Sequence, residues 1–242
     1  MGLIQIEQLS VEPRLHPLSV EISAGQVMGL IGPNGAGKST LLGAIAGLIE
    51  YSGRIRLNET DLDALSPAER AQKIALQPQF IQSVWALSVH DVVSMGRLPW
   101  GDSDQAIIQQ AMQQAGICEL ARRRVDELSG GEKARVWLAR VLANQPEVML
   151  VDEPVASLDI AHQQQAMQLL VDYAAGGRAV IIAIHDLSLA ARYCDRLCLL
   201  DHGRIMAQGS VAQVLDEAML QPVFATDVFI DLAASPPVVL AK

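Results

Sequence analysis

The residues with the clearest chemical potential form a glycine-rich loop between an apolar run and a helix-like run. Gly32, Gly37, Lys38 and Ser39 match the pattern G-x-x-x-x-G-K-[S/T]. Glycines allow the backbone angles that turn successive N–H groups inward, and the start of a helix adds partial positive charge. Such a loop binds nucleotide phosphates, with Lys38 as a point charge on the β- and γ-phosphates. We expect the whole loop to hold ATP: Gly32, Pro33, Asn34, Gly35, Ala36, Gly37, Lys38, Ser39 and Thr40.

Two carboxylates follow a second apolar run and supply the other half of a nucleotide site. Asp152 and Glu153 come directly after the run VMLV at residues 148–151. An isolated Asp-Glu pair is more often a solvated turn, but bare acids at a strand end are costly unless a cation or substrate compensates them. We therefore expect Ser39 to bind Mg²⁺ directly and Asp152 to bind it through water. Glu153 is then the candidate general base that polarises the attacking water.

A histidine follows the third apolar run. His185 comes directly after residues 179–184, which read AVIIAI. A lone histidine is more often a packed or surface residue. In a parallel sheet, however, the residues that face a ligand emerge at the carboxyl ends of the strands. We therefore expect His185 to contact a phosphate during catalysis.

Composition excludes several other classes of protein. The formal net charge is −9, so the basic footprint of a nucleic-acid-binding protein is missing. No apolar run approaches the roughly 18 residues that cross a bilayer, and the first residues lack the layout of a secretory signal. The three cysteines are too few for a disulfide framework, and Cys194 and Cys198 lack a second pair to complete a metal site. We expect a cytoplasmic protein without a nucleic-acid partner.

The elements that would position these residues are strands of a central sheet. The runs at residues 27–31, 148–151 and 179–184 are short and apolar throughout, which predicts strands buried on both faces by helices. Alternating stretches at residues 3–9 and 54–57 predict a small antiparallel layer beside the main sheet.

Helical spacing replaces the strand pattern in the middle of the chain. It predicts an inserted helical subdomain at about residues 81–145, between core segments at residues 1–80 and 146–205. One domain would then span residues 1–232 and leave a short tail at residues 233–242. The Ser-Pro-Pro sequence at residues 235–237 is expected to end the ordered chain.

With the sequence LSGGE at residues 128–132, the chain resembles the ATPase subunit of an ATP-binding-cassette (ABC) transporter. The phosphate loop, Gln79, this signature, the Asp-Glu pair, the SLD loop at residues 157–159 and His185 occur in the order of that family. The resemblance covers essentially residues 1–232. It implies an α/β fold with a P-loop NTPase (RecA-like) core, an antiparallel β layer and an inserted helical subdomain that carries the signature.

The resemblance also implies that the site is shared between two chains. In a head-to-tail homodimer, ATP would lie between the phosphate loop of one protomer and Ser129, Gly130 and Gly131 of the other. Two glycines that open a helix agree with this, because they provide a second anion-binding helix N-terminus. By the same resemblance, Gln79 would contact the metal and the attacking water, and Asp159 would cross the interface.

The sequence departs from the common family pattern at two places. Glu132 replaces the more usual glutamine, a change that we expect to be harmless. Residues 11–16, which read VEPRLH, contain no Tyr or Phe where the family usually stacks the adenine. Arg14 or His16 could cover the base with a planar group instead, and the choice between them stays open, as does base selectivity.

An aromatic cluster indicates where membrane subunits would dock. Core packing of the insert explains part of it, but in the family this region receives the coupling helices of the permease. The cluster contains Phe80, Ile81, Val84, Trp85, Leu87, Met95, Leu98, Pro99 and Trp100.

Local strings resemble importers of iron-siderophores, haem and cobalamin. They lie at residues 96–100, 158–163 and 222–228, and residues 11–17 are similar to the cobalamin type. The resemblance implies permease subunits, an indirect periplasmic substrate-binding protein and a place at the cytoplasmic face of the inner membrane. An exporter ATPase and a soluble ABC ATPase of ribosome function or iron-sulfur assembly are the alternatives. A neighbouring gene for a ten-helix permease would favour import.

Overall fold

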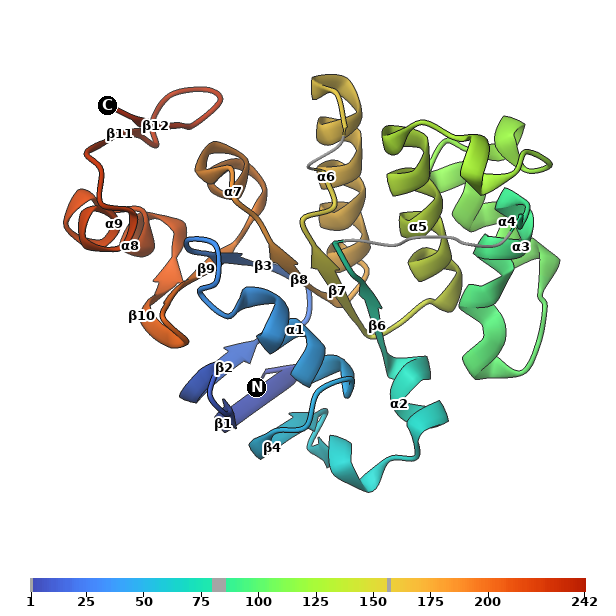
Figure 1. Cartoon of the computed structure of the whole chain (residues 1–242), viewed down its shortest axis with the longest axis horizontal. Helices are drawn as coiled ribbons and strands as arrows, with labels where there is room; N and C mark the ends of the chain where they lie inside the picture. The colour runs from blue at the N-terminus through green and yellow to red at the C-terminus, as the bar shows by residue number, and fades with distance from the viewer. Residues whose placement is uncertain (1, 80–85, 156–157) are drawn as a thin grey trace.

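A six-stranded sheet lies at the centre of the computed structural model, which describes residues 2–79, 86–155 and 158–242 (Figure 1). The strand order is β10-β9-β3-β8-β7-β6, with β10 antiparallel to β9 and all other neighbours parallel. Every residue of β7 and β8 is buried. The three apolar runs thus form strands of the central sheet, as predicted, and the structure shows that these strands are neighbours. The strands are β3 (Gln26–Ile31), β6 (Ile74–Gln77), β7 (Val148–Asp152), β8 (Ala179–Ala183), β9 (Arg196–Asp201) and β10 (Arg204–Ser210).

The predicted antiparallel layer is a second sheet in the order β2-β1-β4-β5. Its strands are β1 (Ile4–Val11), β2 (Leu15–Ile22), β4 (Ser52–Leu57) and β5 (Thr60–Asp61). Buried and exposed positions nearly alternate along β2, because one face packs inward and the other meets solvent. One hydrophobic cluster contains Ile4 of β1, Leu42 of helix α1 (Lys38–Ala46) and Met28 of β3. The small sheet therefore packs with α1 and the central sheet as one core.

Helices α3, α4 and α5 form a group beside β6 and β7, on the right in Figure 1. Helix α5 packs against both α3 and α4. The helical spacing predicted in the middle of the chain corresponds to helices that include α4 and α5. The elements of this part of the chain are η1 (Leu62–Ala64), α2 (Pro67–Lys73), α3 (Val89–Ser94), η2 (Met95–Trp100), α4 (Gln105–Gln114), η3 (Cys118–Leu120), η4 (Val125–Glu127) and α5 (Gly130–Asn144).

The last third of the chain adds further helices. They are α6 (Ile160–Ala175), α7 (Leu187–Tyr193), α8 (Val211–Val214) and α9 (Glu217–Phe224). The longest, α6, has 16 residues. Across the described ranges, no helix combines the length and the apolar character that crossing a membrane requires.

The prediction that residues 235–237 end the ordered chain is wrong. Strand β12 (Val238–Ala241) follows them and pairs antiparallel with β11 (Val228–Asp231). The Ser188 hydroxyl holds this hairpin to α7, because it donates to the Val239 carbonyl at 3.0 Å and accepts from the Val239 N–H at 2.9 Å. The prolines lie between the two strands, and Val239 after them is buried.

Candidate functional site

The predicted site residues follow strands that end at one edge of the central sheet. The phosphate loop follows β3, Gln79 follows β6, Asp152 ends β7, and His185 follows β8. Because β3, β8, β7 and β6 are parallel neighbours, their carboxyl ends meet at the same edge. The order of the strands thus brings together residues that are up to 153 positions apart between Gly32 and His185.

The phosphate loop has the backbone shape that an anion site requires. Gly32 and Gly37 have φ values of 143° and 107°, a region that favours glycine, and α1 begins directly after them. Lys38 is buried, and its Nζ donates to the carbonyl oxygens of Gly32 at 2.7 Å and Pro33 at 3.0 Å. Burial lowers the pKa of Lys38, and the nearby Glu153 and Asp152 oppose that shift. The ammonium group is thus held inside the loop, where it can exchange carbonyl contacts for phosphate oxygens.

Replacing Gly32 with alanine should weaken nucleotide binding by tenfold or more and destabilise the fold by about 1–3 kcal/mol. A Cβ at this position would lie 2.0 Å from the Leu200 carbonyl oxygen, so the loop must move. Calorimetric titration with ADP and thermal unfolding would measure both effects. Gly35→Ala is the control, because a Cβ there meets nothing within 4 Å and the two residues share a positive φ. Equal behaviour of the two variants would contradict the steric explanation.

Asp152 and Ser39 fit a divalent cation. The Asp152 side chain is buried, and burial raises its pKa although hydrogen bonding to Ser39 opposes the shift. Its Oδ1 atom has no hydrogen-bond partner among the described residues. A buried carboxylate oxygen in this position is costly unless a cation approaches it, and Ser39 is exposed beside it. A hard cation such as Mg²⁺, which prefers few protein oxygens and several waters or phosphates, suits this pair.

The cysteines supply no competing metal centre. In the described part of the chain, no group of three or more His, Cys, Asp and Glu residues is placed to hold an ion. Cys194 and Cys198 are both buried, and burial raises the pKa of each thiol to about 12. They act as small apolar residues of the core, as the sequence indicated.

Glu153 is the point at which the other predicted residues converge. Its Oε2 accepts a hydrogen bond from Gln79 Nε2 at 2.6 Å, and its Oε1 is hydrogen bonded to His185 Nε2. The backbone of Glu153 has a φ of 50°, and its N–H donates to the Ala183 carbonyl at 3.1 Å. A left-handed backbone is costly for glutamate and is typical of functional sites. A carboxylate held by two side chains at the edge of a cleft can accept a proton from a water molecule.

Most of the phosphate loop, Gln79 and Glu153 line one cleft of about 640 Å³, whereas Asp152 and His185 are not among the described residues of its lining. The cleft contains residues that the sequence did not single out, namely His202 and Gly203 in the turn after β9. In the sequence, this turn is indicated only by the buried strand before it, β9. His16, one of the two candidates for covering the base, is not among the described residues that line it. The lining comprises Pro13, Arg14, Asn34, Gly35, Ala36, Gly37, Lys38, Ser39, Thr40, Gln79, Glu153, His202 and Gly203.

The signature lies outside this cleft. Ser129 caps α5, and Ser129 and Glu132 exchange the hydrogen bonds of a capping box. None of Ser129, Gly130 and Gly131 belongs to the described residues that line the cleft. The signature at the N-terminus of α5 is therefore separate from the phosphate loop of its own chain.

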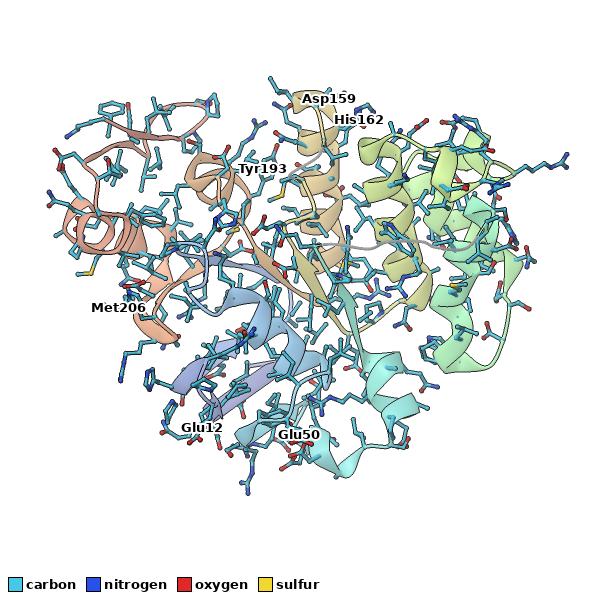
Figure 2. All side chains as sticks on the ribbon, viewed as in Figure 1. Glu12, Glu50, Asp159, His162, Tyr193 and Met206 are labelled. Atoms are coloured by element: carbon cyan, nitrogen blue, oxygen red, sulfur yellow. The ribbon has the colours of Figure 1, made fainter. Side chains whose placement is uncertain are left out.

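Asp159 is also separate from the cleft. It caps α6 by accepting from the His162 N–H at 2.9 Å, and its side chain is 67% exposed (Figure 2). That hydrogen bond lowers the pKa of the Asp159 carboxyl. Ser157, in the same loop, lies outside the described residues, as do Phe80, Ile81, Val84 and Trp85 of the aromatic cluster.

Comparison with known proteins identifies the family of this chain. The family model described as "ABC transporter" matches residues 15–156. The hemin import ATP-binding protein HmuV of Rhodococcus jostii is 43% identical over 88% of this chain and 75% of its own length. The achromobactin transport ATP-binding protein CbrD of Dickeya dadantii is 40% identical over 87% of this chain and 81% of its own.

A solved structure agrees with these relatives. A metal-chelate type ABC transporter in an inward-facing conformation superposes with a TM-score of 0.83 at 26% identity, over 96% of this chain and 92% of that one. The predicted α/β fold with a P-loop NTPase core is thus confirmed. The chain belongs to the ABC transporter family, as an ATPase subunit whose ATP hydrolysis is coupled to transport.

Proposed function

We propose that this chain powers the import of haem or an iron-siderophore across a membrane, with a cobalamin-type substrate as the next candidate. The observation that carries this proposal is the high similarity to relatives named for hemin and achromobactin transport, which spans 88% and 87% of the chain. The strings at residues 96–100 and 222–228 support the same class of importer. An exporter remains the alternative, because the two directions of transport share the same ATPase machinery.

In the proposed reaction, the phosphate loop and Lys38 hold the β- and γ-phosphates of ATP. Mg²⁺, when bound by Ser39, Asp152 and Gln79, would neutralise the charge that develops on the transferred phosphate. Glu153 accepts the proton of the water that attacks the γ-phosphate, and Gln79 orients that water. His185 contacts the γ-phosphate and, through its hydrogen bond, keeps the Glu153 carboxylate aimed into the cleft.

The complete site requires two chains. Ser129, Gly130 and Gly131 of a second protomer would bring the N-terminus of its α5 to the γ-phosphate, and Asp159 would cross the same interface. The position of the signature outside its own cleft supports this arrangement, as does the exposure of Asp159. The additional charge stabilisation then arises only when ATP joins the two protomers.

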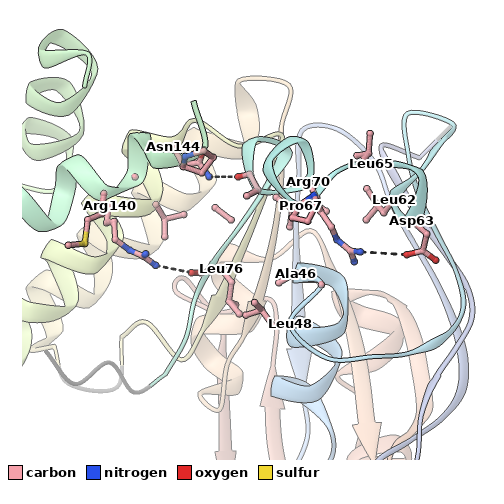
Figure 3. Close-up of a pocket in the computed structure, with 18 residues that line it drawn as sticks. Ala46, Leu48, Leu62, Asp63, Leu65, Pro67, Arg70, Leu76, Arg140 and Asn144 are labelled. Carbon is pink, nitrogen blue, oxygen red and sulfur yellow. Dashed lines mark hydrogen bonds and ion pairs between the residues drawn. The ribbon is translucent and has the colours of Figure 1, made fainter. Parts of the chain in front are cut away.

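A groove at the other end of α1 from the phosphate loop suits the membrane subunits. It has a volume of about 600 Å³ and lies between α1, η1, α2 and β6 on one side and η2 and α5 on the other (Figure 3). We assign these sides to the core at residues 1–80 and 146–205 and to the helical subdomain at about residues 81–145. Together they form one domain at residues 1–232, and the tail expected at residues 233–242 adds β12 to the hairpin that packs on α7.

The rim of the groove is apolar and its walls are held by polar contacts. Leu48 is 73% exposed and lines the groove, and Leu98, which is 72% exposed, precedes the lining residue Pro99 in η2. Arg70 pairs with Asp63 at 3.6 Å, and Asn144 Nδ2 donates to the Ala71 carbonyl at 2.7 Å (Figure 3). Exposed leucines at the rim of a preformed groove are typical of a partner surface, so a permease helix is the proposed occupant.

Leu48→Asp should reduce association with the permease by tenfold or more, the loss expected for an interface anchor. Nucleotide affinity should stay unchanged because the groove and the nucleotide cleft share no lining residue. Co-purification and ADP titration would measure the two effects. Met206→Asp is the matched control, since Met206 is 50% exposed on β10, away from the groove (Figure 2). Full retention of the permease by Leu48→Asp would contradict this docking site.

The proposed assembly is peripheral, at the cytoplasmic face of the inner membrane. Permease subunits would hold the ATPase homodimer there, and a periplasmic binding protein would deliver the substrate without contacting this chain. Co-purification with candidate permeases, followed by ATPase assays with loaded binding protein, tests the whole proposal. Stimulation by haem, a ferric siderophore or cobalamin would support import and identify the substrate. Stimulation of ATP hydrolysis only by substrate added on the side of the membrane where the ATPase lies would contradict import.

A further inference from the structure

Part of the lining of the nucleotide cleft is not explained by the motifs. Besides the phosphate loop, Gln79 and Glu153, the cleft is lined by Pro13, Arg14, His202 and Gly203. Since a nucleotide bound by its phosphates must place its nucleoside elsewhere in the same cleft, these residues are its neighbours. Among the described residues that line the cleft, none is Phe, Tyr or Trp.

We propose that the guanidinium plane of Arg14 covers the adenine of bound ATP, in place of an aromatic ring. Guanidinium groups are planar, weakly hydrated and stack well on aromatic faces. The inference deepens the proposed function, because it rests on ATP binding by this cleft and identifies the residue that holds the base.

The backbone of Arg14 is fixed against the phosphate loop. A Cβ on Gly203 would lie 2.3 Å from the Arg14 carbonyl oxygen, so only glycine allows this approach. Gly203 in turn donates to the Ala36 carbonyl at 3.0 Å and accepts from the His16 N–H at 2.9 Å. The segment that carries Arg14 is therefore tied to the phosphate loop through Gly203. The backbone that carries Arg14 thus lies beside the loop that would bind the phosphates.

The Arg14 side chain is available for a ligand. It is exposed, and it makes no hydrogen bond or ion pair with any side chain in the described ranges. Other arginines of this chain already stack on rings, with Arg97 5.0 Å from the centroid of Trp100 and Arg178 4.6 Å from that of Tyr173. The proposed contact repeats this geometry with a nucleobase as the ring.

Two neighbouring residues are weaker candidates. His16 is exposed in β2 and is not among the described residues that line the cleft. His202 lines the cleft but its side chain is 92% exposed on a left-handed turn residue. Its ring therefore has little protein surface against which to hold a base.

Calorimetric titration of the full chain with ADP tests the proposal, with Arg14 changed to Ala, Tyr and Lys. Stacking predicts that Arg14→Ala weakens ADP binding by about five- to twentyfold. Arg14→Tyr should restore wild-type affinity, because a neutral ring also stacks, whereas Arg14→Lys should resemble Arg14→Ala. His16→Ala is the matched control and should bind ADP as the wild type does.

Each other outcome overturns the proposal. Restoration by lysine would show a charge contact with phosphate, and unchanged binding by Arg14→Ala would show that the base is held elsewhere. A larger loss with His202→Ala than with Arg14→Ala would assign the base to the histidine. If the cleft does not bind ATP at all, the result is different. The wild type would then bind no ADP, or Lys38→Ala would leave the affinity for ADP unchanged.

Discussion

A Glu153→Gln protein will bind ATP with near wild-type affinity, lose turnover by a factor of about 10²–10⁴ and accumulate as an ATP-bound dimer. The amide has the size of the carboxylate but cannot accept a proton from water. The phosphate loop and Lys38 do not depend on the carboxylate for their shape, since Lys38 is held by backbone carbonyls. Phosphate release assays and light scattering with MgATP would measure turnover and assembly.

Glu50→Gln provides the matched control for this change. Glu50 is exposed and lies outside the nucleotide cleft (Figure 2), so the same exchange of carboxylate for amide should leave turnover unchanged. Near-native turnover by Glu153→Gln would exclude Glu153 as the base. Gln79 and His185 would then be reassigned as groups that hold a structural rather than a reacting carboxylate.

A Gly130→Asp protein will bind ADP normally but will fail to dimerise with ATP and will lose most of its ATPase activity. The new carboxylate stands in the first turn of α5, where a negative charge favours the helix, so folding is preserved. In the shared site, however, it would face the γ-phosphate of the ATP bound to the partner. Repulsion between these like charges, in a poorly hydrated interface, costs several kcal/mol.

Light scattering with and without ATP, combined with ADP titration, separates these effects. Gly177→Asp is the control, because a Cβ at Gly177, after the end of α6, meets no atom within 4 Å, although the φ of 82° adds some local strain. The control should dimerise with ATP. An ATP-driven dimer of Gly130→Asp with the wild-type stability would contradict the placement of the signature at the γ-phosphate.

Much of the site was predictable because its residues follow apolar strands. The runs that became β3, β7 and β8 are buried throughout, and only a strand covered on both faces reads in this way. The rule that ligands bind at the carboxyl edge of a parallel sheet then brought Glu153 and His185 to the phosphate loop. Gln79 was placed by family resemblance alone, since the sequence around it carries no chemical signal of its own.

Other features depend on contacts between distant segments. Gly203 approaches both Arg14 and Ala36, and nothing in the local sequence of the β9–β10 turn indicates this. The left-handed backbone of Glu153 is equally hidden, because glutamate does not favour that conformation. The groove that contains Leu48 is assembled from segments nearly 100 residues apart, so no single motif marks it.

At the end of the chain, a local sequence signal led to a wrong prediction. Two adjacent prolines indicated a stop, yet a turn that contains proline can also return the chain for another strand. The short run after residue 237 pairs with β11 as strand β12. Its hydrogen bond with Ser188 of α7 holds it against the rest of the protein. Tertiary packing here overrides the local signal.

The central claim is that one chain carries half of a catalytic site. The most direct test is the initial rate of ATP hydrolysis by the isolated wild-type chain over a wide dilution series with saturating MgATP. The rate should rise with the square of the protein concentration while the chain is mostly monomeric, and linearly once ATP-bound dimers dominate. A rate per chain that stays constant down to concentrations at which light scattering finds only monomers would contradict a shared site.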